Sequence, residues 1–292
     1  MNNVDVVCVG QALIDCITRG KEPYKKNVYR AHSISLSVGG DAINEASILR
    51  RLGKKVKLVC GLGNDMAGNL VLDAARERGL DVSLVTRRED IVTPIANLMV
   101  DDQAGRVSYN SPATMLPDYI PDPSVVKGAK VLSLASVFRA PLDTKEAIIA
   151  LVKAAKAEGA LVCMDTKIPT YREISIEDIA EILPFVDYMF PNENEAAYMT
   201  GKTDFMEMAT YLHEMGVKNV IVKTGKEGCT VCGEKEAFHM PALDVEAIDS
   251  TGAGDNFVAG FIAALLDGED LKNCCKKGTA CAAECVQHAG AY

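Results

Sequence analysis

The chain has 292 residues, of which 48% are hydrophobic and 24% charged, and its formal net charge is −9. A chain of this length and composition can bury a substantial core and is typical of a soluble globular α/β protein. The acidic balance speaks against a nucleic-acid partner, because no basic run offsets it, and no apolar run is long enough to span a membrane.

The first predicted element is a strand over residues 4–10, whose nearly continuous apolar run is typical of a buried parallel strand. Asp15 follows near the carboxyl end of this strand. In open parallel sheets ligands bind at that edge, so Asp15 is a candidate ligand-binding residue, with an ordinary loop aspartate as the alternative. From about residue 14 to 36 the sequence lacks a helical period and predicts short strands of a lid that leaves the main sheet.

Two adjacent glycines, Gly39 and Gly40, precede a helix predicted over residues 42–52. Because glycine has no Cβ, it lets the backbone approach a ligand closely. Asn44 lies on the first turn of this helix and would face the same cleft. For Asp41 we expect a role as helix cap rather than a contact to the ligand.

The next elements continue the alternation of strands and helices. They are a strand over residues 56–60, a helix over 66–78 and a strand over 82–85. The glycine-rich loop at 61–68 lacks the third glycine of a dinucleotide-binding fingerprint. Residues 94–100 and 106–109 then predict a hairpin. We assign this hairpin to the lid, where Tyr109 and Asn110 would contribute to substrate choice.

A regular alternation returns after residue 130. The predicted strands are 131–134, 161–165 and 186–190, and the helix between the first two is 143–158. Such an alternation implies right-handed crossovers and a parallel sheet with helices on both faces. The expected fold class is α/β, a three-layer Rossmann-like sandwich with a mostly parallel central sheet and a small β-sheet lid. We expect one domain over residues 1–292, in which the lid segments, about 14–36 and 94–110, are inserted.

A helix is predicted directly after the strand at 186–190, and its first turn carries Asn192 and Glu195. The spacing of three residues puts both side chains on one face of the helix and fits a capping box. Residues 219–223 predict the next strand, which ends in a turn that carries glycines. The sequence therefore brings further polar residues to the carboxyl edge of the sheet.

The stretch Asp249-Ser-Thr-Gly-Ala-Gly-Asp255 precedes an amphipathic helix that runs to about residue 268. A helix start preceded by glycines leaves backbone N–H groups unpaired, and together with the positive end of the helix dipole they form a site for an anion. A carboxylate at Asp255 would repel phosphate, but it makes sense as a proton acceptor. The alternative is that Asp255 caps the helix. A last helix is predicted around 271–286.

Two of these stretches resemble the signatures of the ribokinase-like carbohydrate kinases, the PfkB family. The C-terminal stretch from Asp249 to Asp255, followed by an apolar helix, resembles one signature. Gly39-Gly40-Asp-Ala-Ile-Asn44-Glu-Ala, running into Gly53, resembles the other. The two occur in the expected order, and further matches between them span nearly the whole chain. The resemblance implies a ribokinase-like fold and an ATP-dependent sugar kinase.

The resemblance also implies roles for single residues on the sugar side. Asp15, Gly39, Gly40 and Asn44 match positions that contact sugar hydroxyls. Asp255 matches the base that accepts the proton of a sugar hydroxyl as it attacks the γ-phosphoryl group of ATP. The N–H groups of the turn would hold the negative charge that develops. These are the amides of Gly252, Ala253 and Gly254.

On the nucleotide side, Asn192 and Glu195 match a pair that helps to hold magnesium and the nucleotide phosphates. Magnesium keeps several waters, so we expect Glu195 to bind it through water. Lys223, Gly225 and Gly228 match a turn that wraps the phosphates, with a solvated strand end as the alternative for Lys223. We call the turn at residues 252–254 the anion turn. Residues between this turn and the last helix would flank the adenine.

Asp249 and Thr251 match positions that order a monovalent cation in some relatives, so we expect modest activation by potassium. One departure from the family pattern stands out. Where many sugar-specific members have Asp-x-Asn-x-Arg, this chain has Asp165-Thr-Lys167-Ile-Pro. Lys167 would serve an anion or a different polar group, and the departure puts fructose and ketodeoxygluconate specificity in doubt. A nucleoside kinase of the adenosine, cytidine or pseudouridine type is the alternative to a ribose-, fructose- or ketodeoxygluconate-like sugar kinase.

Two other classes are disfavoured. A dinucleotide-dependent oxidoreductase would need a glycine fingerprint after the first strand, which is missing, and no Walker-type motif indicates a P-loop kinase. A ligand-binding regulator descended from kinases would not need an intact Asp255, Asn192 and Glu195.

The ten cysteines lie mostly in apolar runs, as reduced buried thiols do, and no signal peptide precedes residue 4. Cys229 and Cys232 have metal or redox spacing, but no second pair accompanies them. We therefore expect a cytoplasmic protein. Lids of relatives pair into dimers, and an exposed sheet edge gives a physical reason for pairing, so a homodimer through the lid is expected.

Overall fold

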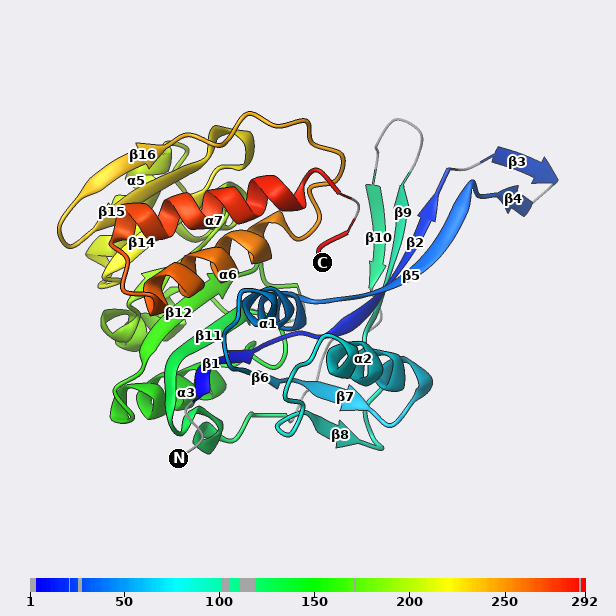
Figure 1. The fold of residues 1–292 in the computed structure, drawn as a ribbon, viewed down its shortest axis with the longest axis horizontal. Coiled ribbons are helices and arrows are strands. Elements are labelled where there is room, and N and C mark those ends of the chain that lie inside the picture. The colour runs from blue at the N-terminus through cyan, green and yellow to red at the C-terminus, as the bar shows by residue number, and fades with distance from the viewer. Residues whose placement is uncertain are drawn as a thin grey trace.

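The computed structural model describes residues 4–20, 22–25, 28–100, 106–110, 119–170, 172–288 and 290–292. An α/β body holds an eight-stranded sheet, and a four-stranded sheet projects from one side of it (Figure 1). Within the described ranges, no helix combines the length and the apolar character that a bilayer crossing requires.

The central sheet has the strand order β16-β15-β14-β13-β12-β11-β1-β6. Its members are β1 (Val4–Val9), β6 (Val56–Val59), β11 (Ala129–Val137), β12 (Leu161–Thr166), β13 (Tyr188–Met189), β14 (Asn219–Lys223), β15 (Cys229–Gly233) and β16 (Ala237–Met240). The six strands in the order β14-β13-β12-β11-β1-β6 pair in parallel, whereas β15 and β16 pair antiparallel at the other edge. The prediction of a mostly parallel sheet is therefore confirmed.

Helices cover both faces of this sheet and make the three-layer sandwich. One face packs against α1 (Asp41–Arg51), α2 (Met66–Glu77), α6 (Ala253–Leu266) and α7 (Leu271–Cys285). The other packs against α3 (Lys145–Ala157), α4 (Glu193–Thr200), α5 (Phe205–Glu214) and the 3-10 helices η2 (Pro123–Val126) and η3 (Glu177–Phe185). Each face has its own cluster of buried apolar side chains. Helices α6 and α7 lie side by side (Figure 1).

The second sheet, which we call the lid, has the order β10-β9-β2-β5. Its strands are β2 (Leu13–Arg19), β5 (Ser33–Gly39), β9 (Ile95–Val100) and β10 (Arg106–Asn110), and the hairpin β3 (Glu22–Lys25) with β4 (Val28–Arg30) extends beyond it. The predicted lid segments, 14–36 and 94–110, include residues 21, 26–27 and 101–105, which lie outside the described residues.

One predicted strand differs from the structure. Over residues 82–85 the backbone forms a turn in which Val85 donates to the carbonyl of Val82 at 3.1 Å, so the prediction of a strand there is wrong. The apolar side chains of both residues pack on the core, which produces a strand-like pattern without strand pairing. The strand comes later, as β8 (Thr86–Arg88), which pairs with β7 (Gly61–Gly63).

Candidate active site

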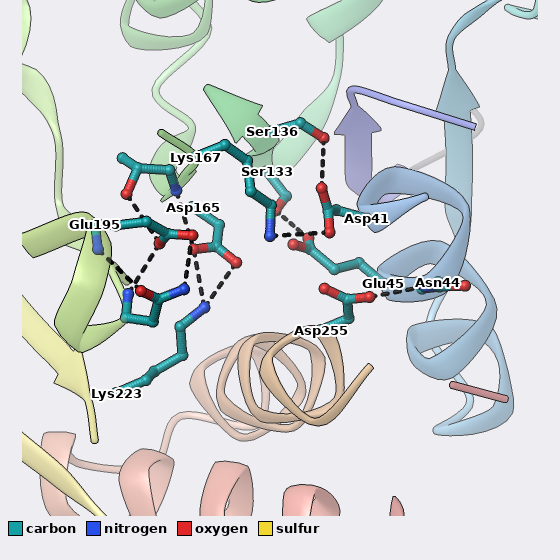
Figure 2. A network of polar contacts seen from close by, with 12 residues as sticks. Asp41, Asn44, Glu45, Ser133, Ser136, Asp165, Lys167, Glu195, Lys223 and Asp255 are labelled. Carbon is teal, nitrogen blue, oxygen red and sulfur yellow. Dashed lines mark hydrogen bonds and ion pairs between the residues drawn. The ribbon is translucent and has the colours of Figure 1, made fainter. Parts of the chain in front are cut away.

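Polar side chains from five elements meet where β11 and β12 end and α1 and α6 begin (Figure 2). Ser133 and Ser136 belong to β11, Asp165 to β12, Lys223 to β14, Asp41, Asn44 and Glu45 to α1, and Asp255 to α6; Lys167 directly follows β12. In parallel sheets the carboxyl ends of the strands share one edge, so segments far apart in sequence converge there.

Asp255 lies in the first turn of α6, and its side chain reaches across to α1. Asn44 Nδ2 donates to Asp255 Oδ2 at 2.8 Å. The N-cap of α6 is Gly252, and no side chain caps the helix, so the alternative of Asp255 as a helix cap is wrong. The residue is 5% exposed. Its carboxylate is thus held by a single amide donor from the neighbouring helix.

The electrostatic surroundings of Asp255 favour a strongly basic carboxylate. Burial raises its pKa well above the usual range, and the nearby carboxylate of Asp41 raises it further. The ammonium of Lys167 and the amide of Asn44 lower it, and Asp165 raises it again. A carboxylate in this setting takes up a proton readily once it is ionised.

The turn before α6 lies beside a cavity that Ala253 and Gly254 line. Among the described residues, the amides of Gly252 and Gly254 donate to no backbone carbonyl. Ala253 differs from the prediction of three unpaired amides, because it donates to the carbonyl of Ser250 at 3.2 Å. Gly252 has a φ of 76°, and a Cβ there would lie 2.2 Å from Cβ of Ala291. A side chain at this position would therefore push the C-terminal segment off the turn.

The cavity beside this turn has a volume of about 480 Å³. Lys223, Gly225, Gly228, Ala253 and Gly254 line one part of it. Apolar residues line much of the rest, namely Leu243, Val245, Phe257, Ala282 and Val286. The combination of backbone amides, a lysine and an apolar wall is suited to a phosphorylated ligand with a planar base.

Lys223 is anchored at the edge of this cavity. Its Nζ lies 2.9 and 2.8 Å from the two carboxylate oxygens of Asp165. It also lies 3.3 Å from the place that a Cβ on Gly254 would take. The side chain is only 12% exposed, so the alternative of a solvated strand end is wrong.

Asn192 and Glu195 form the capping box of α4. Asn192 Oδ1 accepts from the amides of Asn194 and Glu195, and the carboxylate of Glu195 accepts from the amide of Asn192 at 2.9 Å. Burial, followed by the charge of Asp165, raises the pKa of Glu195 to about 7. The hydrogen bonds of the capping box do not use all the lone pairs on the carboxylate oxygens of Glu195.

Of the residues that the structure describes, no three His, Cys, Asp or Glu gather as direct ligands for a metal ion. Glu195 and Asp165 nevertheless place two carboxylates close to each other and to Lys223, as the charge effects on Glu195 indicate. Magnesium commonly binds proteins through one or two carboxylates and several waters. These residues therefore fit magnesium held largely through water.

On the lid side, Asp15 lies in β2 between Ser37 of β5 and Ala96 of β9. A Cβ on Gly39 would lie 2.2 Å from Asp15 Oδ2, and one on Gly40 would lie 2.6 Å from the carbonyl oxygen of Gln11. We expected these glycines to make room for a ligand. In the structure the protein itself fills the space beside them, so they let two chain segments approach each other.

Sequence reasoning missed an ion pair inside this site. Lys167 Nζ lies 3.1 Å from Asp41 Oδ1, and Ser136 Oγ donates to Asp41 Oδ2 at 3.0 Å. The prediction that Asp41 caps α1 is therefore wrong, since Gly40 is the N-cap and no side chain caps that helix. In the sequence, the departure from the family pattern at Lys167 was the signal that pointed to this part of the site.

Glu45 is a second residue that the sequence did not single out. It is fully buried behind Asp41, and Ser133 Oγ lies 2.5 Å from its Oε2. Its Oε1 has no hydrogen-bond partner among the described residues. Burial, followed by the charge of Asp165, raises its pKa well above the usual range.

Asp249 connects the turn before α6 with two other segments. Its Oδ1 accepts from the amide of Thr251 at 2.9 Å, and its Oδ2 accepts from the amide of Gly290 at 3.2 Å. The guanidinium of Arg19, at the end of β2, lies 3.8 Å from Oδ2. The predicted cation-site residue thus joins the lid, the anion turn and the C-terminal segment.

Comparisons with known proteins identify chains to which this one is similar. The model of the pfkB family carbohydrate kinases matches residues 3–292. The chain is 27% identical to a probable fructokinase-5 of Arabidopsis thaliana, with 98% of this chain and 92% of the relative covered. It is 28% identical to a nucleoside kinase of Methanothermobacter thermautotrophicus, with 98% and 90% covered. The solved structure of Arabidopsis thaliana ribokinase in complex with ribose and ATP has a TM-score of 0.86 at 25% identity, with 99% and 94% covered.

Proposed function

Because the chain belongs to the pfkB family of carbohydrate kinases, we propose that it transfers the γ-phosphoryl group of ATP to an alcohol group of a small sugar. A ribose-, fructose- or ketodeoxygluconate-like sugar is the proposed acceptor class. The observation that carries the proposal is the Asp255 carboxylate, held by Asn44 Nδ2 at 2.8 Å, beside a turn with free amides and an adjoining cavity.

In the proposed reaction the acceptor hydroxyl oxygen forms a bond to the γ-phosphorus, and the bond between that phosphorus and the bridging oxygen of ADP breaks. Asp255 takes the hydroxyl proton, which typically contributes ~10²–10⁴-fold to the rate. The amides of Gly252 and Gly254 hold the negative charge that develops. The amide of Ala253 already donates to the carbonyl of Ser250, so it contributes less to holding this charge.

For the nucleotide, we propose that Lys223, Gly225 and Gly228 hold the phosphates and that the apolar wall of the cavity takes the adenine. Asn192 and Glu195 would hold magnesium, largely through water. Magnesium, when bound, neutralises charge on the phosphates. Phosphoryl transfer depends mostly on alignment and charge stabilisation, so the rigid anchoring of Lys223 and Glu195 suits this role.

The acceptor side consists of Asp15, Asn44 and Asp255, with Gly39 leaving room for the carboxylate of Asp15. A nucleoside is the second candidate acceptor, because it also presents a ribose hydroxyl to the base. The chain is about as similar to a named nucleoside kinase as it is to the fructokinase, which supports a nucleoside as the second candidate acceptor. A panel of sugars and nucleosides therefore belongs in the first assay.

We further propose modest activation by potassium through Asp249 and Thr251, next to the anion turn. The contact of Asp249 with the amide of Gly290 supports a role in ordering the C-terminal segment around that turn. We also propose a homodimer through the lid. Exposed apolar side chains on one face of the lid support it more strongly than the sheet edge that first suggested pairing.

The test is the Asp255→Asn variant in a coupled ADP-release assay over the acceptor panel. For the best acceptor we expect kcat to fall by roughly 10²–10⁴-fold, with nucleotide affinity retained. Asp267→Asn, an exposed residue after the other end of α6 that pairs with Lys54, is the matched control and should keep full activity. Near-normal kcat in Asp255→Asn would rule out the proposed base.

A further inference from the structure

We propose that Lys167 is a catalytic residue that contacts the γ-phosphoryl group of ATP during transfer, and that Asp41 holds its ammonium in place in the free enzyme. This inference rests on the proposed kinase function. It assigns a role to the residue at which the chain departs from the pattern of its family.

The position of Lys167 is the first support. Its backbone amide donates to the carbonyl of Val137 at 2.8 Å, which fixes the segment after β12 against the end of β11. Figure 2 shows the side chain between two groups, one around Asp165, Glu195 and Lys223 and the other around Asp41 and Asp255. The first group lies on the nucleotide side and the second on the acceptor side. A phosphoryl group that moves from one to the other must pass close to Lys167.

The second support is that Asp41 itself is held by several contacts. Its Oδ1 lies 3.1 Å from Lys167 Nζ, and its Oδ2 accepts from Ser136 Oγ at 3.0 Å. Ser136 Oγ in turn accepts from the amide of Gln11 at 3.2 Å. The carboxylate is therefore fixed by β11 and by the segment after β1, and it orients the lysine rather than capping its own helix. Asp41 is thus a positioning residue.

The third support is the charge balance of the site. Asp41, Glu45, Asp165, Glu195 and Asp255 place five carboxyl groups around it. The ammonium of Lys223 is already shared between both oxygens of Asp165. A γ-phosphoryl group carries charge on its three equatorial oxygens and would be repelled beside the base. A second ammonium is needed there, and Lys167 supplies it.

Lys167 also has the protonation state and the freedom that this role requires. Burial favours its neutral form, but the carboxylates of Asp41, Asp165, Glu195 and Asp255 outweigh burial and raise its pKa well above the usual range. It stays an ammonium throughout and donates hydrogen bonds, while the proton of the acceptor goes to Asp255. Its side chain is 28% exposed, so it can turn from Asp41 toward a phosphate that arrives from the open side.

The competing explanation is a structural ion pair that only holds α1 against the end of β12. The two roles differ in what they do to nucleotide binding. A contact to the γ-phosphoryl group strengthens the binding of a nucleotide that carries one, and leaves ADP nearly unaffected. A structural pair changes stability and has no preference between the two nucleotides.

The experiment compares ADP with a non-hydrolysable ATP analogue by isothermal titration calorimetry in the presence of Mg²⁺. We expect Lys167→Met to weaken the analogue by about tenfold or more relative to ADP, the usual scale for a hydrogen bond to a charged group. Lys167→Arg should restore most of this preference. Lys202→Met, an exposed lysine outside the site, is the control and should bind both nucleotides as the unmodified protein does.

A second variant covers the case in which Lys167→Met leaves Asp41 as an unpaired carboxylate and fails to fold. Asp41→Asn combined with Lys167→Met removes that charge, and it should show the same selective loss for the analogue. An unchanged ratio of the two affinities in a folded Lys167 variant would overturn the inference. If the unmodified protein bound neither nucleotide, the proposed kinase function itself would fail, which is a different result.

Discussion

Asp255 has to be ionised to act as a base, although its surroundings disfavour the charge. Burial and the carboxylates of Asp41 and Asp165 raise its pKa, whereas Lys167 and Asn44 lower it. A lysine near a buried aspartate therefore has two effects at once. It lowers the pKa of the base, and it offers a positive charge to the phosphoryl group.

This balance predicts the pH dependence of the reaction. The ionised form of Asp255 is the active one, and its pKa is raised, so kcat should rise with pH through a limb that lies well above 3.8, the usual value for aspartate. In Lys167→Met the limb should move to still higher pH, because the charge that lowers the pKa of Asp255 is lost. Initial rates at saturating ATP, Mg²⁺ and acceptor across a pH series measure both limbs.

The contributions of other titratable groups near Asp255 must be distinguished from its own in the pH series. They are Asp41 and Glu45 on α1, Asp165 on β12 and Cys285 on α7. Glu195, with a pKa of about 7, should alter the apparent affinity for Mg²⁺ rather than kcat at saturation, and Glu195→Gln separates the two. A limb at the ordinary aspartate pKa, or one that Lys167→Met leaves in place, would contradict the assignment.

Single residues differ in how far the sequence could predict them. Asp255 and Asn44 lie 211 positions apart and meet, and each belongs to a stretch with a recognisable local pattern. The pair of Lys167 and Asp41 has no such pattern, because it exists only once α1 and β12 are packed at their final distance. Local spacing predicts caps and turns, and it predicts ion pairs across elements only when another constraint fixes the packing.

At the scale of elements, the apolar period predicted most of the central strands and helices. It was wrong at residues 82–85 because partly buried apolar side chains on a turn look like a strand. Helix α5 and strand β16 were not predicted. The residues of β16 alternate between partly buried and exposed, which leaves only a weak signal at the sheet's antiparallel edge.

One buried carboxylate links four elements at the amino ends of the strands, the edge of the sheet opposite the site. Asp187, just before β13, accepts from the amide of Val162 in β12 and from Lys218 Nζ before β14, each at 2.8 Å. It also pairs with Lys156 of α3. Burial opposes its ionisation, but the hydrogen bonds from the two lysines and the amide outweigh burial and lower its pKa.

We therefore predict that Asp187→Asn destabilises the fold at neutral pH by roughly 1.5–3 kcal/mol, the range for hydrogen bonds to a charged group. Because the folded pKa is lowered, this stabilisation is present above the unfolded pKa of about 3.9 and is lost as pH falls through the folded pKa. Urea unfolding at neutral pH and below about pH 4 measures the difference.

The control for this prediction is Asp73→Asn, which breaks an exposed pair with Arg76 on α2. Such surface pairs contribute about 0–1 kcal/mol, so this variant should unfold almost as the unmodified protein does. A loss for Asp187→Asn that is the same at both pH values would show that shape, rather than charge, accounts for the effect.

For the whole molecule, the lid has two unlike faces. Residues that pair across the strands share a face, so Asp15, Ser37 and Ala96 lie on one side. The opposite side carries a set of exposed apolar residues from three strands, which we call the outer lid face. It consists of Ile34, Leu36, Ile95, Met99, Val107 and Tyr109.

The sequence predicted that the lid would pair through an exposed edge, and the structure points instead to this face. Ile34 and Leu36 are 68% and 64% exposed, although both are large and apolar. An exposed apolar patch of this kind on a sheet indicates a partner surface, and a second copy of the lid has the matching chemistry. The sequence could not separate face from edge, because the pairing register of β2 with β5 and β9 decides which side each residue takes.

We therefore predict that the protein is a dimer in solution and that Leu36→Lys makes it monomeric. A lysine on the outer lid face, in the edge strand β5, places a charge in an apolar contact, and two copies would bring two like charges together. Sedimentation analysis at several concentrations measures the state. Leu70→Lys, an exposed leucine of α2 on the body, is the matched control and should remain dimeric. A monomeric unmodified protein, or a Leu36→Lys variant that stays dimeric, would exclude the outer lid face as the interface.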